Sequence, residues 1–321
     1  MDQLPVELVL EVAAFLHLGC LRNLRLTASW LARATTPSLF RHLGLLYTAD
    51  AISDLKALLA ENSSIARNVT TLKICHAAWP KRGRSQWRTH PLLFGGEGRG
   101  KRHGPAADRA YHAYENFLRS QRCLTVADLG CLLLTLPRLE CITIDHIREW
   151  RREKHPRYLR LRKSIWLEPH MSDPVGATVS SVLQALAISG GCSVLQISGK
   201  FSPRGLVKCA SLSYVSTLVI ASLRTIGPQC LSIFLASFPE LKHLFLEMPE
   251  HQQETPLSLQ TSSLPRLETL ELRCCQVSGH NLAELTQQHE SLLRVRAFDV
   301  TLIGATWQSI AADAPRVTFE V

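Results

Sequence analysis

The chain has 321 residues, of which 46% are hydrophobic and 20% charged, so it can bury a substantial core and is not disordered throughout. No stretch approaches the ~18 uninterrupted apolar residues of a membrane-spanning helix, and Asp2 and Glu7 near the start argue against a secretory signal. We therefore expect a soluble protein of the cytoplasm, the nucleus or both, with no membrane partner.

The cysteines and the short motifs argue against a metal site and against catalysis. Ten cysteines occur without a single C-x-x-C pair, the spacing typical of structural zinc sites. Most lie in apolar runs such as those around Cys75 and Cys131, which predicts reduced thiols in the core. Neither G-x-S-x-G nor H-E-x-x-H is present. We expect a protein that is not an enzyme and holds no metal or cofactor.

The net charge of +9 is confined to two segments. Residues 81–102 hold seven basic residues and one acid, and residues 148–163 hold eight basic residues and two acids, so each segment carries +6. The remainder, with 21 basic and 24 acidic residues, carries −3. The sequence thus indicates a nearly neutral body with two basic insertions, not a uniformly basic protein.

Residues 3–43 contain three short helical patterns. The first follows Leu4-Pro5 and breaks at Gly19, and the third ends at Pro37. In the first pattern the apolar residues repeat every three to four positions, which predicts one apolar stripe along a helix. The apolar residues of the first two patterns are Leu8, Val9, Val12, Ala13, Leu16, Leu21, Leu24 and Leu26.

This stretch resembles an F-box in its Leu-Pro pair, its acidic and apolar first helix, its leucine-rich second helix and its closing aromatic residue, Phe40. It departs from that pattern at Thr27, where an aliphatic residue is usual, and around residues 17–20. The resemblance implies docking on the Skp-type adaptor of a cullin-based ubiquitin ligase. The alternative is a helical cap on the rest of the chain. The adaptor-binding residues implied are Leu4, Pro5, Leu8, Val12, Leu16, Leu21 and Leu24.

The rest of the chain repeats the motif L-x-x-L-x-L, with aliphatic substitutes. Each copy predicts a short strand with one inward face. The middle residues of the copies are Leu72, Ile142, Leu195, Leu218, Leu244, Leu270 and, in a weaker copy, Val295. From residue 195 onward the intervals are 23, 26, 26 and 25 residues. One strand and one helix per ~20–29 residues is the leucine-rich-repeat arrangement.

Helical patterns separate these strands at 179–187, 229–238, 281–289 and 305–312. An F-box followed by irregular leucine-rich repeats is similar to the F-box/LRR-like proteins of filamentous fungi. We therefore expect an α/β chain with a three-helix F-box at 1–45 and an irregular leucine-rich-repeat-like α/β solenoid at 46–321 that binds substrate. The alternative is a two-layer α/β domain whose strands are evenly spaced.

The two insertions, at about 79–105 and 148–166, supply the candidate ligand contacts. Arginine clusters favour acidic or phosphorylated groups. The first insertion contains Gly95-x-x-x-x-Gly100-Lys101, but Arg102 replaces the hydroxyl residue of a phosphate-binding loop, and His103-Gly104-Pro105 does not favour a helix start. The candidate substrate or phosphate contacts are Arg82, Arg84, Arg88, Arg151 and Arg152.

Together these features predict a non-catalytic substrate-recognition adaptor of an SCF-type ubiquitin ligase. The F-box would bind the Skp-type adaptor and, through it, a cullin, and the repeats would bind a protein substrate that is acidic or phosphorylated. One alternative is a nucleic-acid-associated protein whose basic insertions contact phosphates, although we do not expect a nucleic-acid partner. Another is an F-box protein that acts outside ubiquitination.

Overall fold

The structure is a computed structural model of the chain. It describes residues 5–77, 104–146, 165, 176–199, 201–203, 211–223, 228–248, 256–257, 259 and 264–321. Both predicted basic insertions fall almost entirely outside these residues.

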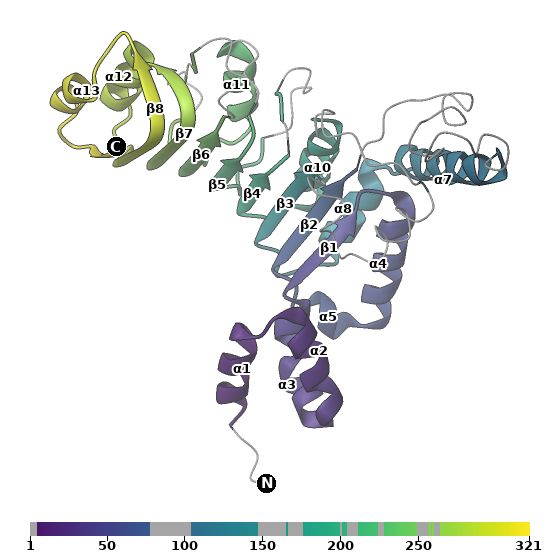
Figure 1. The fold of residues 1–321 in the computed structure, drawn as a ribbon. Coiled ribbons are helices and arrows are strands. Elements are labelled where there is room, and N and C mark those ends of the chain that lie inside the picture. Colours follow the sequence, from purple (N-terminus) through teal and green to yellow (C-terminus); the bar gives the residue numbers. More distant parts are fainter. Residues whose placement is uncertain are drawn as a thin grey trace, which may run out of the picture.

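An N-terminal unit of three helices lies below the sheet in Figure 1. Helix α1 (Val6–Phe15) and helix α2 (Leu18–Thr27) both pack against α3 (Ser29–Phe40). The core of this unit is small: Val9 and Ala13 of α1 and Leu21 of α2 are its buried apolar side chains among the described residues. So small a core leaves much of the helices' apolar surface uncovered.

Two helix boundaries differ from the predictions. The first break falls at Leu16, whose backbone is extended, so Gly19 lies inside α2 and does not end the run. Helix α3 also continues through Pro37 to Phe40. Proline removes one N–H but keeps a helical φ, and the hydroxyls of Thr35 and Thr36 bond to carbonyls one turn earlier, both at 2.7 Å.

The rest of the described chain forms one sheet of nine parallel strands whose spatial order follows the chain order (Figure 1). The strands are β1 (His42–Leu46), β2 (Thr71–His76), β3 (Cys141–His146), β4 (Val194–Ile197), β5 (Thr217–Ile220), β6 (His243–Glu247), β7 (Thr269–Ser278), β8 (Arg294–Ile303) and β9 (Thr318–Glu320). The mixed α/β class is thus confirmed. Two strands at the ends of the sheet, β1 and β9, were not predicted, and β1 crosses the expected domain boundary at residue 45.

In all seven predicted motifs the middle and last apolar residues lie in strands, and the middle residues pair with one another across the sheet. Leu218, for example, is the register partner of both Leu195 and Leu244. The complete row runs Leu43, Leu72, Ile142, Leu195, Leu218, Leu244, Leu270, Val295 and Phe319. Most of its members are fully buried, so the repeated spacing reflects one continuous core.

A recurring turn sets the register of the strands. Where the sequence reads L-P-R-L, the N–H of Leu139 donates to the carbonyl of Leu136, and the N–H of Leu267 donates to that of Leu264. Leu241 and Val317 make the same i to i−3 bond after prolines at 239 and 315. Proline favours the second position of such a turn because its φ is already fixed there. These four turns therefore lead into β3, β6, β7 and β9.

Helices connect the strands and cover one side of the sheet (Figure 1). They are α4 (Ala49–Glu61), α5 (Ser63–Ala66), α7 (Gly104–Arg122), α8 (Val126–Leu134), α10 (Gly176–Ser189), α11 (Pro228–Leu235), α12 (Gly279–Gln288) and α13 (Trp307–Asp313). All four predicted helical stretches form. The expectation that residues 103–105 disfavour a helix start was wrong, because α7 begins at Gly104, with Pro105 in the first turn, where a missing N–H costs no bond.

Candidate functional site

Helix α1 carries more apolar surface than its small unit can bury. Val9 and Ala13 face the other two helices and are buried. Leu8, Val12 and Phe15 recur at positions i, i+4 and i+7 on another side of the helix, where 47%, 55% and 90% of each residue is exposed. We call Leu8, Val12 and Phe15 the α1 stripe. A helix that is apolar on more than one side requires a further packing partner.

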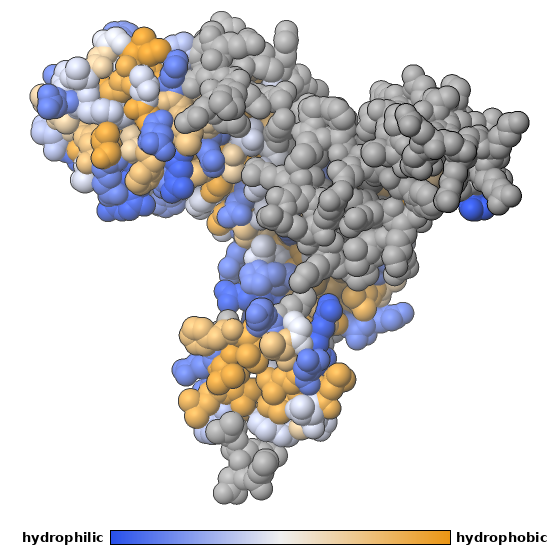
Figure 2. Space-filling model, in the orientation of Figure 1, coloured by the Kyte–Doolittle hydropathy of each residue, from blue (hydrophilic) through white to orange (hydrophobic). Residues whose placement is uncertain are grey.

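Hydrophobic residues beyond the stripe extend this surface. Val6 and Leu10 of α1 are also exposed, and Leu26 of α2 is 86% exposed. In Figure 2, hydrophobic residues cover much of the visible face of the N-terminal unit. Isolated exposed apolar residues are ordinary on a protein surface, but a concentration of this kind on forty residues is typical of an interaction surface.

The structure divides the residues expected to bind the adaptor. Leu8 and Val12 are exposed in the α1 stripe, and Pro5 is exposed at the N-cap of α1. Leu21 is buried, so it supports the packing of the unit and is not on its surface. Leu16 and Leu24 are partly buried, and Leu4 lies outside the described residues. The predicted arginine contacts Arg82, Arg84, Arg88, Arg151 and Arg152 also lie outside the described part of the chain.

Sequence reasoning did not select Phe15 or Leu26 as contacts, although both are the most exposed large apolar residues of the unit. A signal for Phe15 exists, since it follows Leu8 by seven residues and Val12 by three. That spacing places Phe15 on the same side of the helix as Leu8 and Val12.

The sheet also has an open face, on the side opposite the row of buried residues that includes Leu195, Leu218 and Leu244. In β4, β5 and β6 the inward residues are buried, and the residues between them are partly exposed. On this open face, the residues that are register partners differ in charge and polarity from one strand to the next. The row reads Lys73, Thr143, Gln196, Val219, Phe245, Glu271, Arg296 and Glu320. Its centre is neutral and its two ends are charged.

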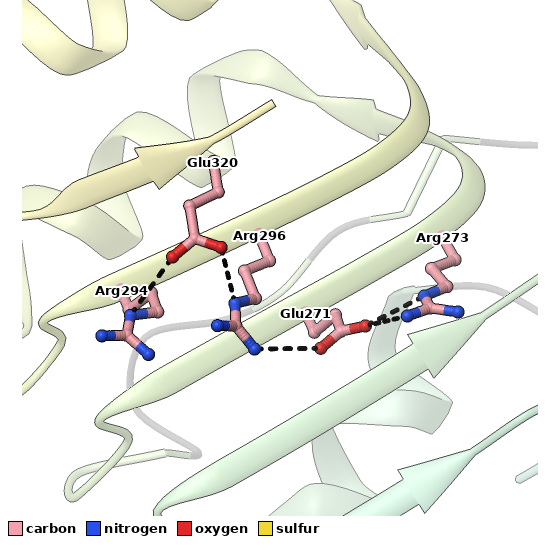
Figure 3. Close-up of polar contacts among 5 residues, drawn as sticks. All are labelled: Glu271, Arg273, Arg294, Arg296 and Glu320. Atoms are coloured by element: carbon pink, nitrogen blue, oxygen red, sulfur yellow. Dashed lines mark hydrogen bonds and ion pairs between the residues drawn. The ribbon is translucent and has the colours of Figure 1, made fainter.

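The charged end at β7–β9 forms a chain of ion pairs (Figure 3). Nε and Nη2 of Arg273 lie 2.9 Å and 2.7 Å from the same oxygen, Oε1 of Glu271. Nη1 of Arg296 lies 3.9 Å from Oε2 of Glu271, and its Nε donates to Oε2 of Glu320 at 2.8 Å. Nε of Arg294 lies 3.5 Å from Oε1 of Glu320. Five alternating charges therefore fix each other's positions, with one positive charge in excess.

Aromatic rings hold Arg273 on both sides. Its guanidinium carbon lies 5.1 Å from the ring centroid of Phe245 and 5.0 Å from that of Phe298. The two phenylalanines come from β6 and β8, the strands on either side of β7. Each distance is within the range of a favourable cation–π contact. The arrangement restrains the plane of the guanidinium while 47% of the Arg273 side chain stays exposed.

The described thiols range from buried through partly exposed to exposed, and Cys131 is exposed, which corrects the expectation that it is a core residue. Burial raises the pKa of Cys192 and of Cys275 to about 12. In contrast, Cys20, Cys123 and Cys131 are exposed. Since the thiolate is the reactive form, we expect iodoacetamide near pH 8 to label the exposed three quickly and Cys192 and Cys275 only after unfolding, as read by peptide mass spectrometry.

Equal labelling of the exposed and the buried thiols in the folded protein would contradict this assignment.

The raised pKa values of the buried thiols also affect the stability of the fold. Because the folded pKa of Cys192 and Cys275 lies above the ordinary value of 9.0, folding favours their neutral form. That contribution is fully present below about pH 9 and is lost as the pH rises to about 12.

Within the described ranges, no group of three or more His, Cys, Asp or Glu side chains is arranged to hold a metal ion. No helix in the described part of the chain combines the length and the apolar character needed to cross a membrane.

Comparison with protein-family models finds no match to this chain, and comparison with curated proteins finds none either.

Proposed function

We propose that this chain is a substrate-recognition subunit of an SCF-type ubiquitin ligase. Its N-terminal unit would act as an F-box that docks on a Skp-type adaptor. Its nine strands and their helices would act as an irregular leucine-rich-repeat solenoid that binds a protein substrate. The proposal rests on the resemblance of the first forty residues to an F-box and on the physical features described above.

The α1 stripe is the observation that carries the proposal. Burying a large apolar side chain completely contributes about 1.5–3 kcal/mol, and Phe15 in particular has almost all of that contribution still to gain. A helical cap that covered the rest of the same chain would have buried the stripe already. The exposed stripe therefore favours a partner in another molecule over an intramolecular role.

The order of the strands supports the solenoid. When parallel strands follow one another in chain order, each right-handed crossover places its helix on the same side of the sheet. The opposite side then remains a continuous surface that spans all repeats. A surface of this kind suits a macromolecular substrate better than a small ligand, which requires a concave pocket.

The test is binding of the full chain to a purified Skp-type adaptor, measured by co-purification and by titration calorimetry. We expect the double variant Leu8→Ala/Val12→Ala to bind at least about tenfold more weakly, because both side chains are central to the stripe. Leu58→Ala serves as the matched control, since Leu58 is a 42% exposed leucine on α4, outside the N-terminal unit. Its affinity should equal that of the wild type.

Circular dichroism must show that the double variant keeps its helices, as expected for exposed positions. A folded wild-type chain that does not bind the adaptor would reject the proposal. So would a double variant that binds as tightly as the Leu58→Ala control.

A further inference from the structure

The backbone around Arg273 has a feature that sets this part of the open face apart. Cys274 and Asp299 both have positive φ, at 50° and 55°, although neither is glycine. They directly follow Arg273 and Phe298, which are register partners on β7 and β8. Non-glycine residues in this region cost about 1–3 kcal/mol each and cluster at functional sites.

These two residues shift the alternation of both strands at the same point. In β7 the buried residues are Leu270 and Leu272 before the shift and Cys275 and Val277 after it. One residue of each strand, Cys274 and Asp299, is left out of the pairing at this point. The matched shift in β8 keeps the strands paired. Arg273 and Phe298 are thus the last pair of the regular register before this shift, side by side on the open face.

Arg273 retains donors for a ligand. A guanidinium has five N–H groups, and here Glu271 accepts from Nε and Nη2 through one oxygen. Among the described residues, Nη1 has no hydrogen-bond or ion-pair partner. A carboxylate can take Nη1 and the second proton of Nη2 together, in the bidentate geometry that only arginine offers. The Phe245 and Phe298 rings pre-orient that edge, so less entropy is lost on binding.

We propose that Arg273 and its two phenylalanines form a binding site for a carboxylate side chain in an extended, acidic and apolar segment of a protein partner. This proposal deepens the proposed function, because it names the chemistry of the substrate. The cluster has one excess positive charge, which complements an acidic group. The exposed edge of Phe298 and the neighbouring Val219 and Phe245 suit an apolar residue beside it. Glu271 and Glu320 stand between the arginines, which disfavours the closely spaced phosphates of a nucleic acid.

The test is fluorescence anisotropy of the full chain with a fluorescein-labelled decapeptide of alternating Glu and Leu. A second decapeptide has Gln in place of every Glu. We expect Arg273→Lys, which keeps the charge and loses the bidentate fork, to bind the acidic peptide at least about tenfold more weakly. Arg266→Gln is the control, because it removes a positive charge paired with Glu240 in the turns before β6 and β7. It should stay within about twofold of the wild type.

Three results would overturn the proposal: no saturable binding by the wild type, equal affinity for both peptides, or equal losses in Arg273→Lys and Arg266→Gln. A single-stranded oligonucleotide provides a fourth check. If it displaces the peptide, binds more tightly than the peptide and loses affinity in Arg273→Lys, the proposal is overturned and the open face is assigned to nucleic acid. Adaptor binding is measured separately on the same variants. If the wild type fails only that assay, the proposed function fails and the Arg273 site stands.

Discussion

Leu218→Ala is expected to lower the free energy of unfolding by about 2–5 kcal/mol. Leu218 is fully buried at the centre of β5, between its register partners Leu195 and Leu244. Truncating it leaves a cavity in the row that joins each repeat to the next, and strands held on both sides cannot collapse to fill it. Urea denaturation followed by circular dichroism measures the loss.

Val219→Ala is the matched control, because Val219 is the next residue of the same strand and lies on the open face, where it is only partly buried. Its substitution should cost less than about 1 kcal/mol. Similar losses for the two variants would mean that β5 does not have one buried and one open side, and the assignment of the open face would fail with it.

Gly279→Ala is expected to destabilise the C-terminal part of the sheet by about 1–3 kcal/mol. Gly279 begins α12 and is buried, and a Cβ added there would lie 2.5 Å from Cβ and 3.0 Å from the backbone nitrogen of Ala305. The segment before α13 would have to move away from α12. Thermal unfolding measures the effect as a lower Tm.

The double variant Gly279→Ala/Ala305→Gly separates this contact from a general effect on the helix. Removing the Cβ of Ala305 relieves the shortest contact, so part of the lost stability should return. If the stability changes of Gly279→Ala and Ala305→Gly, measured singly, simply add in the double variant, the close approach of α12 to residue 305 is not the cause.

The repeated spacing was a reliable guide to the sheet because one physical requirement, a buried leucine in every strand, recurs in every repeat. The two strands at the ends of the sheet, β1 and β9, were not predicted, because the motif is incomplete at β9 and overlaps the helical unit at β1. Ahead of β9, the place of the first apolar residue of the motif is taken by Arg316, whose Nη2 donates to three carbonyls at the end of α12. In β1 the pattern is present as Phe40, Leu43 and Leu45, but Phe40 also closes the helical unit.

The candidate sites were harder to predict, since they depend on which apolar residues stay uncovered and on which strands become neighbours. Leu21 and Val12 look equivalent in the sequence, yet only Val12 is exposed. The Arg273 site combines residues of β6, β7 and β8. Its two phenylalanines, Phe245 and Phe298, are more than fifty residues apart in the sequence. The residues between the paired leucines of each repeat carry this information, but only the register of β7 on β8 shows that Arg273 lies beside Phe298.

The most direct test of the central proposal is hydrogen exchange of the full chain, read by mass spectrometry with and without a Skp-type adaptor. Helices α1 and α2 are short and pack around a small core, so their amides should exchange quickly in the free chain. We expect the adaptor to slow exchange in residues 6–27 and to leave β2–β8 unchanged. Unchanged exchange in residues 6–27 at a saturating adaptor concentration would contradict the account, as would protection confined to the open face of the sheet.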